Sequence, residues 1–244
     1  MRFLKNHPFA IEAFFDSSLV LTFAVPKDEL QPYIPKCLEL DTFQDKWAFI
    51  AIAMVQTSGL RMKGLPKFLG NDFFLIGYRI FVRYTNSANK RLRGLYIIKS
   101  ETDKKKMETL GNIFTHYNYT TTDIQQIKTT DSQIITSVNS KFHITINRSD
   151  IPANLPKHSP FTDWKEARKF AGPLPFTFTY NPNNKTVLVI EGVRQNWHPQ
   201  PVMINDYNFD FLNNLKLQDM VLANAFEIRN APYYWKKGKI EQWV

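Results

Sequence analysis

Three consecutive lysines, Lys104, Lys105 and Lys106, are the first residues whose types and spacing could do chemistry. A lysine held in a dry pocket beside a second cation loses its proton near neutral pH, and its free amine can form a Schiff base with a carbonyl compound. Apolar residues follow the triplet at helical spacing, at Met107, Leu110 and Phe114. Successive helix residues lie about 100° apart, so three in a row cannot all face one pocket. A solvated helix start is therefore the favoured interpretation.

A second candidate is an arginine on a predicted strand, residues 73–84. Side chains alternate along a strand, and the even-numbered face of this segment is apolar throughout, so we expect it to pack against an outer layer. The other face carries Gly77 and Arg79. Glycine leaves room, and arginine offers a planar fork that fits a carboxylate. Arg79 therefore suits a ligand cavity, although a structural ion pair explains it equally well.

His116 and Glu191 are candidates for acid–base chemistry. His116 follows the predicted helix, where a neutral imidazole could donate or accept a proton, although a capping or surface histidine is the favoured interpretation. Glu191 and Arg194 lie three residues apart on a predicted strand, so they point to opposite faces unless Gly192 forms a bulge. Because Glu191 shares its face with valines, its carboxylate needs a partner, and Arg79 is one candidate.

Length and composition limit the possible classes. The chain has 244 residues, of which 43% are hydrophobic, so it can build a substantial core, and we expect a single domain over residues 1–244. Cys37 is the one cysteine, which excludes an internal disulfide and a cysteine-based zinc site. The histidines lack metal-ligand spacing and no phosphate-binding loop is present, so we expect neither a metal nor a cofactor.

The formal net charge of +9 raises the question of an anionic partner. The lysines are scattered and no nucleic-acid-binding motif accompanies them, so a specific nucleic-acid partner is not expected, and binding through the basic surface is only a weak alternative. The longest apolar run, residues 47–55, is too short to cross a bilayer as a helix. The first residues are not expected to form a secretory signal. We therefore expect a soluble, cytoplasmic protein with no membrane partner.

Strand patterns dominate the chain. Helices are predicted over residues 102–114 and 161–172, the second ended by Gly172 and Pro173. Hairpins are predicted over residues 132–147, 176–194 and, around Lys237 and Gly238, at the C-terminus, and a strand pair over 38–43 and 47–57. Residues 217–226 are ambiguous between helix and strand, and residues 146–160 form either a surface loop or a mobile lid. This balance predicts a mostly β fold, a closed antiparallel barrel or sandwich with peripheral helices.

These segments resemble a known family. The stretch FAVPKDELQPYIPKCLELDTFQDKWAFIAIAMVQTSGLRMKGLP, then FFLIGYRIFVRY and RGLYIIKSETD, is similar to the first half of the DUF2071 (YqjF-like) family. ARKFAGPLPFTFTY, VIEGVR and APYYWKKG fit related members less exactly. The resemblance covers residues 19–119 well and the remainder loosely. It implies an acetoacetate decarboxylase-like barrel or cone with a central ligand cavity, usually in an oligomer, and it implies no established reaction.

The resemblance also bears on the reactive lysine. The named decarboxylase of this superfamily uses a cavity lysine as Schiff-base former, with a second lysine beside it, after the helix that follows a Gly-Tyr strand. The equivalent stretch here, FTHYNY at residues 114–119, contains no lysine. Leu75 stands where family members often carry a glutamate, whereas Arg79 matches a common arginine. Decarboxylation through a lysine Schiff base is therefore disfavoured.

The sequence thus predicts a cavity that binds a small organic acid or other carbonyl compound. The candidate ligand-binding residues are Gly77, Arg79, Tyr119 and Arg194. An enzyme of lyase or isomerase type, with His116 and Glu191 as catalytic acid and base, is one alternative, and a non-catalytic sensor is another. A homo-oligomer is the expected assembly.

Overall fold

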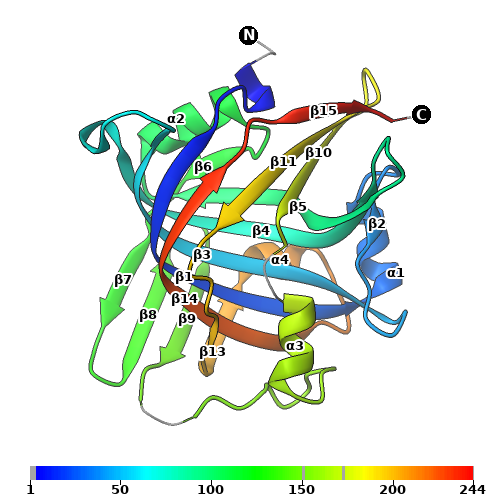
Figure 1. Cartoon of the computed structure of the whole chain (residues 1–244). Helices are drawn as coiled ribbons and strands as arrows, with labels where there is room; N and C mark the ends of the chain where they lie inside the picture. The colour runs from blue at the N-terminus through cyan, green and yellow to red at the C-terminus, as the bar shows by residue number, and fades with distance from the viewer. Residues whose placement is uncertain (1–3, 150–151, 172–173, 244) are drawn as a thin grey trace.

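The computed structural model describes residues 4–149, 152–171 and 174–243, and a ring of strands dominates it (Figure 1). Long strands rich in β-branched and aromatic residues favour this arrangement, because both of their faces are buried along most of their length. Around the ring the order is β14 (Val221–Trp235), β1 (Ile11–Pro26), β3 (Trp47–Met62), β4 (Asn71–Thr85), β5 (Arg91–Thr102), β10 (Phe176–Asn181) and β11 (Thr186–Arg194), which returns to β14.

Two short registers close the ring. β11 pairs antiparallel with β14 from Gly192↔Trp235 to Arg194↔Tyr233. β10 pairs with β5 from Phe176↔Gly94 to Phe178↔Tyr96, and this pairing is parallel. The predicted closed, mostly β architecture is confirmed, with this parallel seam as a departure from a purely antiparallel barrel. Shorter strands extend the sheet: β2 (Glu39–Leu40), β6 (Tyr119–Thr121), β12 (Gln200–Pro201) and β15 (Lys239–Gln242).

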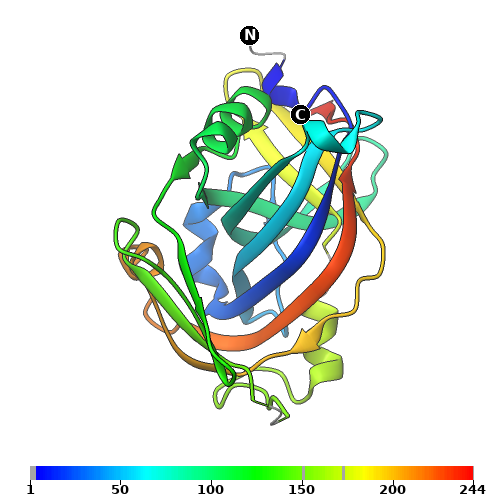
Figure 2. The ribbon, with the colours of Figure 1, turned by 90° about the vertical axis from the view of Figure 1, so that its left-hand side faces the viewer.

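A second sheet covers one outer face of the ring (Figure 2). Its strands run in the order β13 (Ile204–Phe209), β9 (Phe142–Asn147), β8 (Ser132–Ser137) and β7 (Gln125–Lys128). The largest hydrophobic cluster lies between the two sheets and takes Ile76, Tyr78 and Ile80 from β4 and Ile144 and Phe209 from the second sheet. The even-numbered face of β4 therefore packs outward as predicted, which leaves the odd-numbered face for the interior of the ring.

The helices lie at the ends and edges of this framework (Figure 1). They are α1 (Lys27–Leu30), α2 (Lys105–Phe114), α3 (Trp164–Ala171) and α4 (Asp210–Asn214), with single 3-10 turns at Leu4–Asn6, Gln31–Tyr33 and Lys67–Leu69. The carboxylate of Asp163 accepts a hydrogen bond from the Glu166 backbone N–H at 2.7 Å, so Asp163 caps α3. Among the described residues, no helix is long and apolar enough to cross a membrane.

Both predicted helices and two of the hairpins are confirmed, β8–β9 and β10–β11. The predicted C-terminal hairpin is wrong, because β15 pairs with β11 rather than with β14. The predicted pair of residues 38–43 and 47–57 is also mostly wrong: β2 pairs with β4, and only an isolated Phe43↔Trp47 bridge joins the two segments. The ambiguous segment becomes strand β14 from Val221. The predicted helix stop at Gly172 and Pro173 lies outside the described residues, as does part of the 146–160 segment.

Candidate ligand cavity

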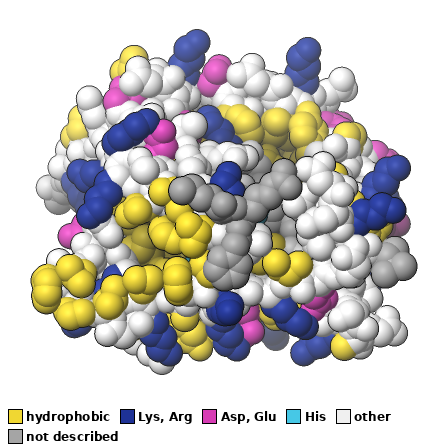
Figure 3. Space-filling model, turned by 90° about the horizontal axis from the view of Figure 1, so that it is seen from above, with side chains coloured by type: hydrophobic (Ala, Val, Ile, Leu, Met, Phe, Trp, Pro, Cys, Tyr) yellow, Lys and Arg dark blue, Asp and Glu magenta, His cyan; other side chains and the backbone are white. Residues whose placement is uncertain are grey.

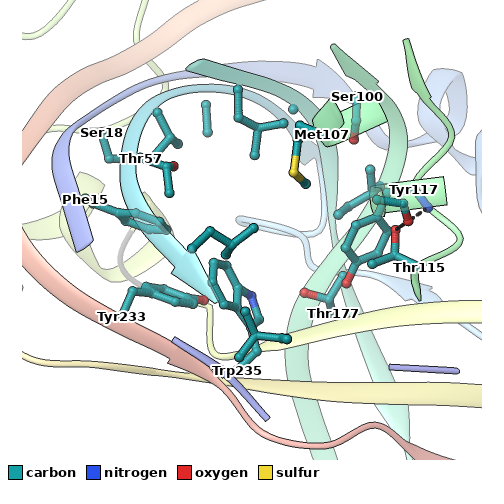
Figure 4. Close-up of a pocket in the computed structure, with 18 of the residues that line it drawn as sticks. Phe15, Ser18, Thr57, Ser100, Met107, Thr115, Tyr117, Thr177, Tyr233 and Trp235 are labelled. Atoms are coloured by element: carbon teal, nitrogen blue, oxygen red, sulfur yellow. Dashed lines mark hydrogen bonds between the residues drawn. The ribbon is translucent and has the colours of Figure 1, made fainter. Parts of the chain in front are cut away.

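A cavity of about 390 Å³ lies inside the ring (Figure 4). Its walls come from the inward faces of β1, β3, β4, β5, β11 and β14 and from α2 with the segment after it. Most of the lining side chains are apolar, and they include Phe15, Val55, Phe73, Leu75, Met107 and Trp235. Exposed residues such as Met62 and Leu69 also line it, so the cavity reaches the surface at the β3–β4 connection.

Arg79 is the charged group at the centre of this cavity. Its side chain folds back over Gly77, where a Cβ would lie 2.9 Å from the Arg79 Nε, so glycine at 77 makes room for the guanidinium. Among the described residues, Arg79 has no ion-pair partner, and its buried Nε has no hydrogen-bond acceptor. Burial lowers the pKa of Arg79, and Arg194 acts in the same direction, while the phenol groups of nearby tyrosines oppose it. A guanidinium nevertheless stays charged at neutral pH.

Arg194 contributes a second cation to the same space. Its Nη2 donates to the Leu174 carbonyl oxygen at 2.8 Å. The guanidinium carbon lies 4.7 Å from the ring centroid of Trp197 and 5.3 Å from that of Tyr233, which is cation–π geometry. The Arg194 Nε and the Trp197 Nε1 are buried without an acceptor among the described residues. Stacking holds the Arg194 side chain in place while leaving donor capacity free.

Tyr119 enters the cavity because α2 allows it to approach closely. A Cβ at Gly111 would overlap the Tyr119 ring, so glycine within the helix is required for this packing. Asn112 fixes the backbone, accepting from the Tyr119 N–H at 2.8 Å and donating to its carbonyl at 2.9 Å. Burial raises the pKa of Tyr119 to about 12, with Arg79 acting in the opposite direction, so its hydroxyl is a neutral donor at physiological pH.

The cavity therefore carries an excess of hydrogen-bond donors and positive charge. Two arginines reach its interior, while no aspartate, glutamate or lysine occurs among the described residues that line it. A third arginine, Arg61, lines the cavity near the β3–β4 connection, but its Nη2 is paired with Glu12 at 2.5 Å. Unpaired buried donors cost free energy unless an acceptor reaches them. The arrangement is complementary to an oxyanion with an apolar body.

The structure brings four of the predicted site residues together. Gly77, Arg79, Tyr119 and Arg194 all line the one cavity. Arg194 reaches it from β11 on the face opposite to Glu191, as strand alternation requires.

His116 and Glu191 lie elsewhere. His116 is half-buried beside Asn6, 3.3 Å from its Oδ1, in a separate polar pocket. Burial, followed by the charge of Lys5, lowers the His116 pKa. Glu191 accepts from Lys236 at 2.8 Å, so its suggested pairing with Arg79 is not formed. The valines on its face, Val187 and Val189, pack into the outer cluster, which explains why Glu191 points away from the cavity.

The lysine triplet is a solvated helix start, as expected. Lys104 is the N-cap residue of α2, and all three side chains are exposed. Lys105 pairs with Glu108 on the same helix at 2.6 Å.

His7 is a cavity residue that the sequence did not reveal. Its side chain is buried and lines the cavity, its Nε2 has no partner among the described residues, and burial lowers its pKa to about 4. The N–H of Gly238 donates to the His7 carbonyl at 2.8 Å, which ties the two ends of the chain together at this point. No periodic pattern surrounds His7, so nothing local marks it as buried.

Comparisons with known proteins agree with this architecture. The family model DUF2071, an uncharacterized conserved protein family, matches residues 13–234. No curated protein sequence matches the chain.

Among solved structures, the chain is similar to acetoacetate decarboxylase from Legionella pneumophila subsp. pneumophila str. Philadelphia 1, with a TM-score of 0.62 at 12% identity over 94% of this chain and 86% of that one. It is also similar to an acetoacetate decarboxylase-like enzyme from Sphingomonas wittichii RW1, with a TM-score of 0.57 at 8% identity over 97% and 94% of the two chains. The enduracididine biosynthesis enzyme MppR, solved with the condensation product of pyruvate and imidazole 4-carboxaldehyde, gives a TM-score of 0.53 at 8% identity over 96% and 88%. At these identities the likeness concerns the fold alone. The match over most of its length, together with the ring of strands, shows that the chain belongs to the DUF2071 family and has an acetoacetate decarboxylase-like fold.

Proposed function

We propose that this protein binds a small organic acid in the central cavity, with the carboxylate held by Arg79 and Arg194. The observation that carries the proposal is the Arg79 guanidinium, which folds over Gly77 between apolar walls and has no ion-pair partner among the described residues. A buried charge without a partner is unfavourable, and a ligand carboxylate would supply the missing acceptors. The planar guanidinium suits bidentate contact with a carboxylate better than an ammonium group would.

The same features argue against Schiff-base decarboxylation. No lysine occurs among the described residues that line the cavity, and the lysine triplet lies in solvent on α2. The nearby tyrosine hydroxyls of Tyr117 and Tyr119, whose pKa values burial raises, are neutral donors suited to a carbonyl or carboxylate oxygen. They support binding of an oxyanion and offer no amine nucleophile.

Acid–base catalysis on the bound acid is a second candidate, and His7 favours it. This buried imidazole lines the cavity, its Nε2 has no partner in the part of the chain that the structure describes, and burial keeps it neutral at physiological pH. The pair that the sequence suggests, His116 and Glu191, stays a prediction, although neither residue lines this cavity in the structure. Product analysis by NMR after incubation with carboxylic acids that bind, using the wild type and His7→Gln, would separate a catalyst from a binder.

Binding is tested by a thermal-shift screen of carboxylic and keto acids, followed by titration calorimetry. We expect acids to stabilise the wild type and Arg79→Met to lose at least tenfold in affinity, because a charge-assisted bidentate contact contributes about 1.5–3 kcal/mol. Arg83→Met is the matched control, since Arg83 lies on the same strand but pairs with Asp41 instead of facing the cavity. Equal acid binding by the wild type and Arg79→Met would contradict the proposal. A homo-oligomer, a single domain and a cytoplasmic location remain predictions.

A further inference from the structure

The two arginines without an ion-pair partner among the described residues, Arg79 and Arg194, lie deep in the cavity, and most of the lining from there to the surface is apolar. Along β4, Arg79 folds back to the level of Gly77, and the next inward-facing residues toward the opening are Leu75 and Phe73. α2 adds Met107, Leu110 and Phe114 to the same wall. Among the described residues, this wall between the arginine and the opening therefore carries no charged group.

The opening is mostly apolar, and its polar lining residues are Asn71 and Arg61, which is paired with Glu12. Phe9, Met62, Leu65 and Leu69 line the cavity and are 43%, 40%, 37% and 50% exposed. Phe68, beside them in the β3–β4 connection, is 84% exposed. Hydrophobic side chains gather on this face in Figure 3, with Lys and Arg side chains around them. An exposed apolar patch joined to an apolar cavity indicates a binding surface for an apolar group.

We propose that the ligand is an unbranched acyl-chain carboxylic acid, with its carboxylate at Arg79 and Arg194 and its hydrocarbon tail running along Leu75 and Phe73 to the apolar opening. This inference rests on the proposed acid binding and narrows its ligand class. A compact polar acid would fill only the level of the arginines and would leave the apolar wall and opening unused. A tail that follows this wall brings both regions into a single binding mode.

The strand geometry gives the length of the tail. The stretch of β4 from Asn71 to Gly77 spans about 20 Å at a rise of about 3.3 Å per residue. Strands in closed sheets tilt by about 35–45°, so the path along the cavity axis is about 15 Å, which suits an acyl chain of roughly ten to twelve carbons. Longer chains would extend past the opening into solvent and would gain little.

A chain-length series tests the inference. Titration calorimetry of the wild type with acetate, hexanoate, octanoate, decanoate, dodecanoate and tetradecanoate, each below its micelle concentration, should show affinity rising about fourfold per methylene. The rise should stop near ten to twelve carbons. Dodecanol, which has the tail without the carboxylate, should bind at least tenfold more weakly than dodecanoate.

A variant that blocks the path provides the second readout. Leu75→Trp places a large side chain between the arginine and the opening, so the chain length that binds most tightly should become shorter than in the wild type. Val138→Trp, at a site that is 75% exposed in the turn between β8 and β9, is the matched control. If Leu75→Trp does not fold, as judged by its thermal melt, Val55→Phe on the neighbouring strand makes the same test.

The possible outcomes separate the two proposals. An affinity that rises with chain length, depends on Arg79 and reaches its maximum at a shorter acid in Leu75→Trp supports both the acid binding and the acyl-chain ligand. Arg79-dependent binding that is flat with chain length, or strongest for a short keto acid or an aromatic acid, overturns the acyl-chain inference and leaves the proposed acid binding intact. Binding of dodecanoate that equals dodecanol and is unchanged in Arg79→Met is non-specific apolar adsorption and overturns both.

Discussion

Replacing Arg79 should make the unliganded protein more stable, not less. The guanidinium is enclosed by apolar walls and has no carboxylate partner among the described residues, so folding removes it from water without a compensating ion pair. Methionine has a similar volume, carries no charge and can follow the same path over Gly77. Exchanging a buried charge for an apolar side chain of similar size often stabilises a protein.

The expected size of this stabilisation follows from the partial enclosure of the Arg79 side chain. Part of its side chain faces the cavity, where solvent can enter, and nearby phenol groups offset some of the cost. We therefore expect Arg79→Met to raise the free energy of unfolding by about 1–2 kcal/mol, toward the low end for buried charges. For a protein of this length that corresponds to an increase in Tm of about 2–8 °C.

Replacing Arg83, on the same strand, should have the opposite effect and destabilise the protein. Its Nε donates to the Asp41 Oδ1 at 2.6 Å, and the Asp41 side chain is fully buried. Arg93 also contacts Asp41, with its Nε 2.7 Å from Oδ2, so the carboxylate keeps one partner when Arg83 is lost. Arg83→Met should therefore lower the free energy of unfolding by about 1–3 kcal/mol.

Urea denaturation of the wild type and both variants without added acid measures these changes. A fall of more than about 1 kcal/mol in Arg79→Met, with Arg83→Met behaving as expected, would refute the reasoning. It would mean that the Arg79 guanidinium makes net stabilising contacts within the protein itself. The proposed ligand role would then lose its main physical support.

Three further predictions concern other parts of the cavity. Gly111→Ala should lower the free energy of unfolding by about 1 kcal/mol, because overlap with the Tyr119 ring outweighs the gain in helix propensity. A thermal melt checks this, and an unchanged Tm would mean that the Tyr119 ring can move away without cost. Burial lowers the His7 pKa to about 4, so the unfolded chain binds the extra proton first, and stability should fall by up to about 3 kcal/mol as pH drops from about 6.5 to 4. His7→Phe should remove most of that pH dependence in urea titrations, whereas a change at the exposed His198 should not, and an unchanged profile in His7→Phe would contradict the assignment. Borohydride treatment with acetoacetate or pyruvate should leave the intact mass unchanged, and a stable adduct on any lysine would restore a Schiff-base mechanism.

Strand periodicity predicts much of the cavity wall. In β4 the alternation of side chains separates Ile76, Tyr78 and Ile80 from Gly77 and Arg79, and burial in the structure follows that separation. The alternation can be recognised in the sequence because one face of β4 is apolar and packs against the second sheet, whereas the other face contains a glycine and an arginine. The spacing of Glu191 and Arg194 likewise places them on opposite faces.

What periodicity does not reveal is which face of β11 turns inward. That choice depends on the packing of Val187 and Val189 against the outer cluster, a contact between segments far apart in sequence. His7 escapes sequence reasoning for the same reason, since its backbone carbonyl accepts from the N–H of Gly238, which lies far away in sequence. The predicted C-terminal hairpin fails because β15 pairs with β11, from Thr186↔Gln242 to Val189↔Lys239, and not with β14. In each case a non-local contact decides the outcome.

The short closing registers of the ring have a consequence for how the chain folds. Long antiparallel pairings join β14 to β1, β1 to β3 and β3 to β4. The β10–β11 hairpin, in contrast, pairs with β5 only over Phe176–Phe178 and with β14 only over Gly192–Arg194. Pairings that close long loops for few hydrogen bonds form late and open first. Amide hydrogen exchange should therefore be fastest, within the ring, at these two seams. The β10–β11 hairpin therefore closes the ring last during folding. Its transient local opening would expose the side of the cavity that carries Arg194 before the other strand pairings of the ring break.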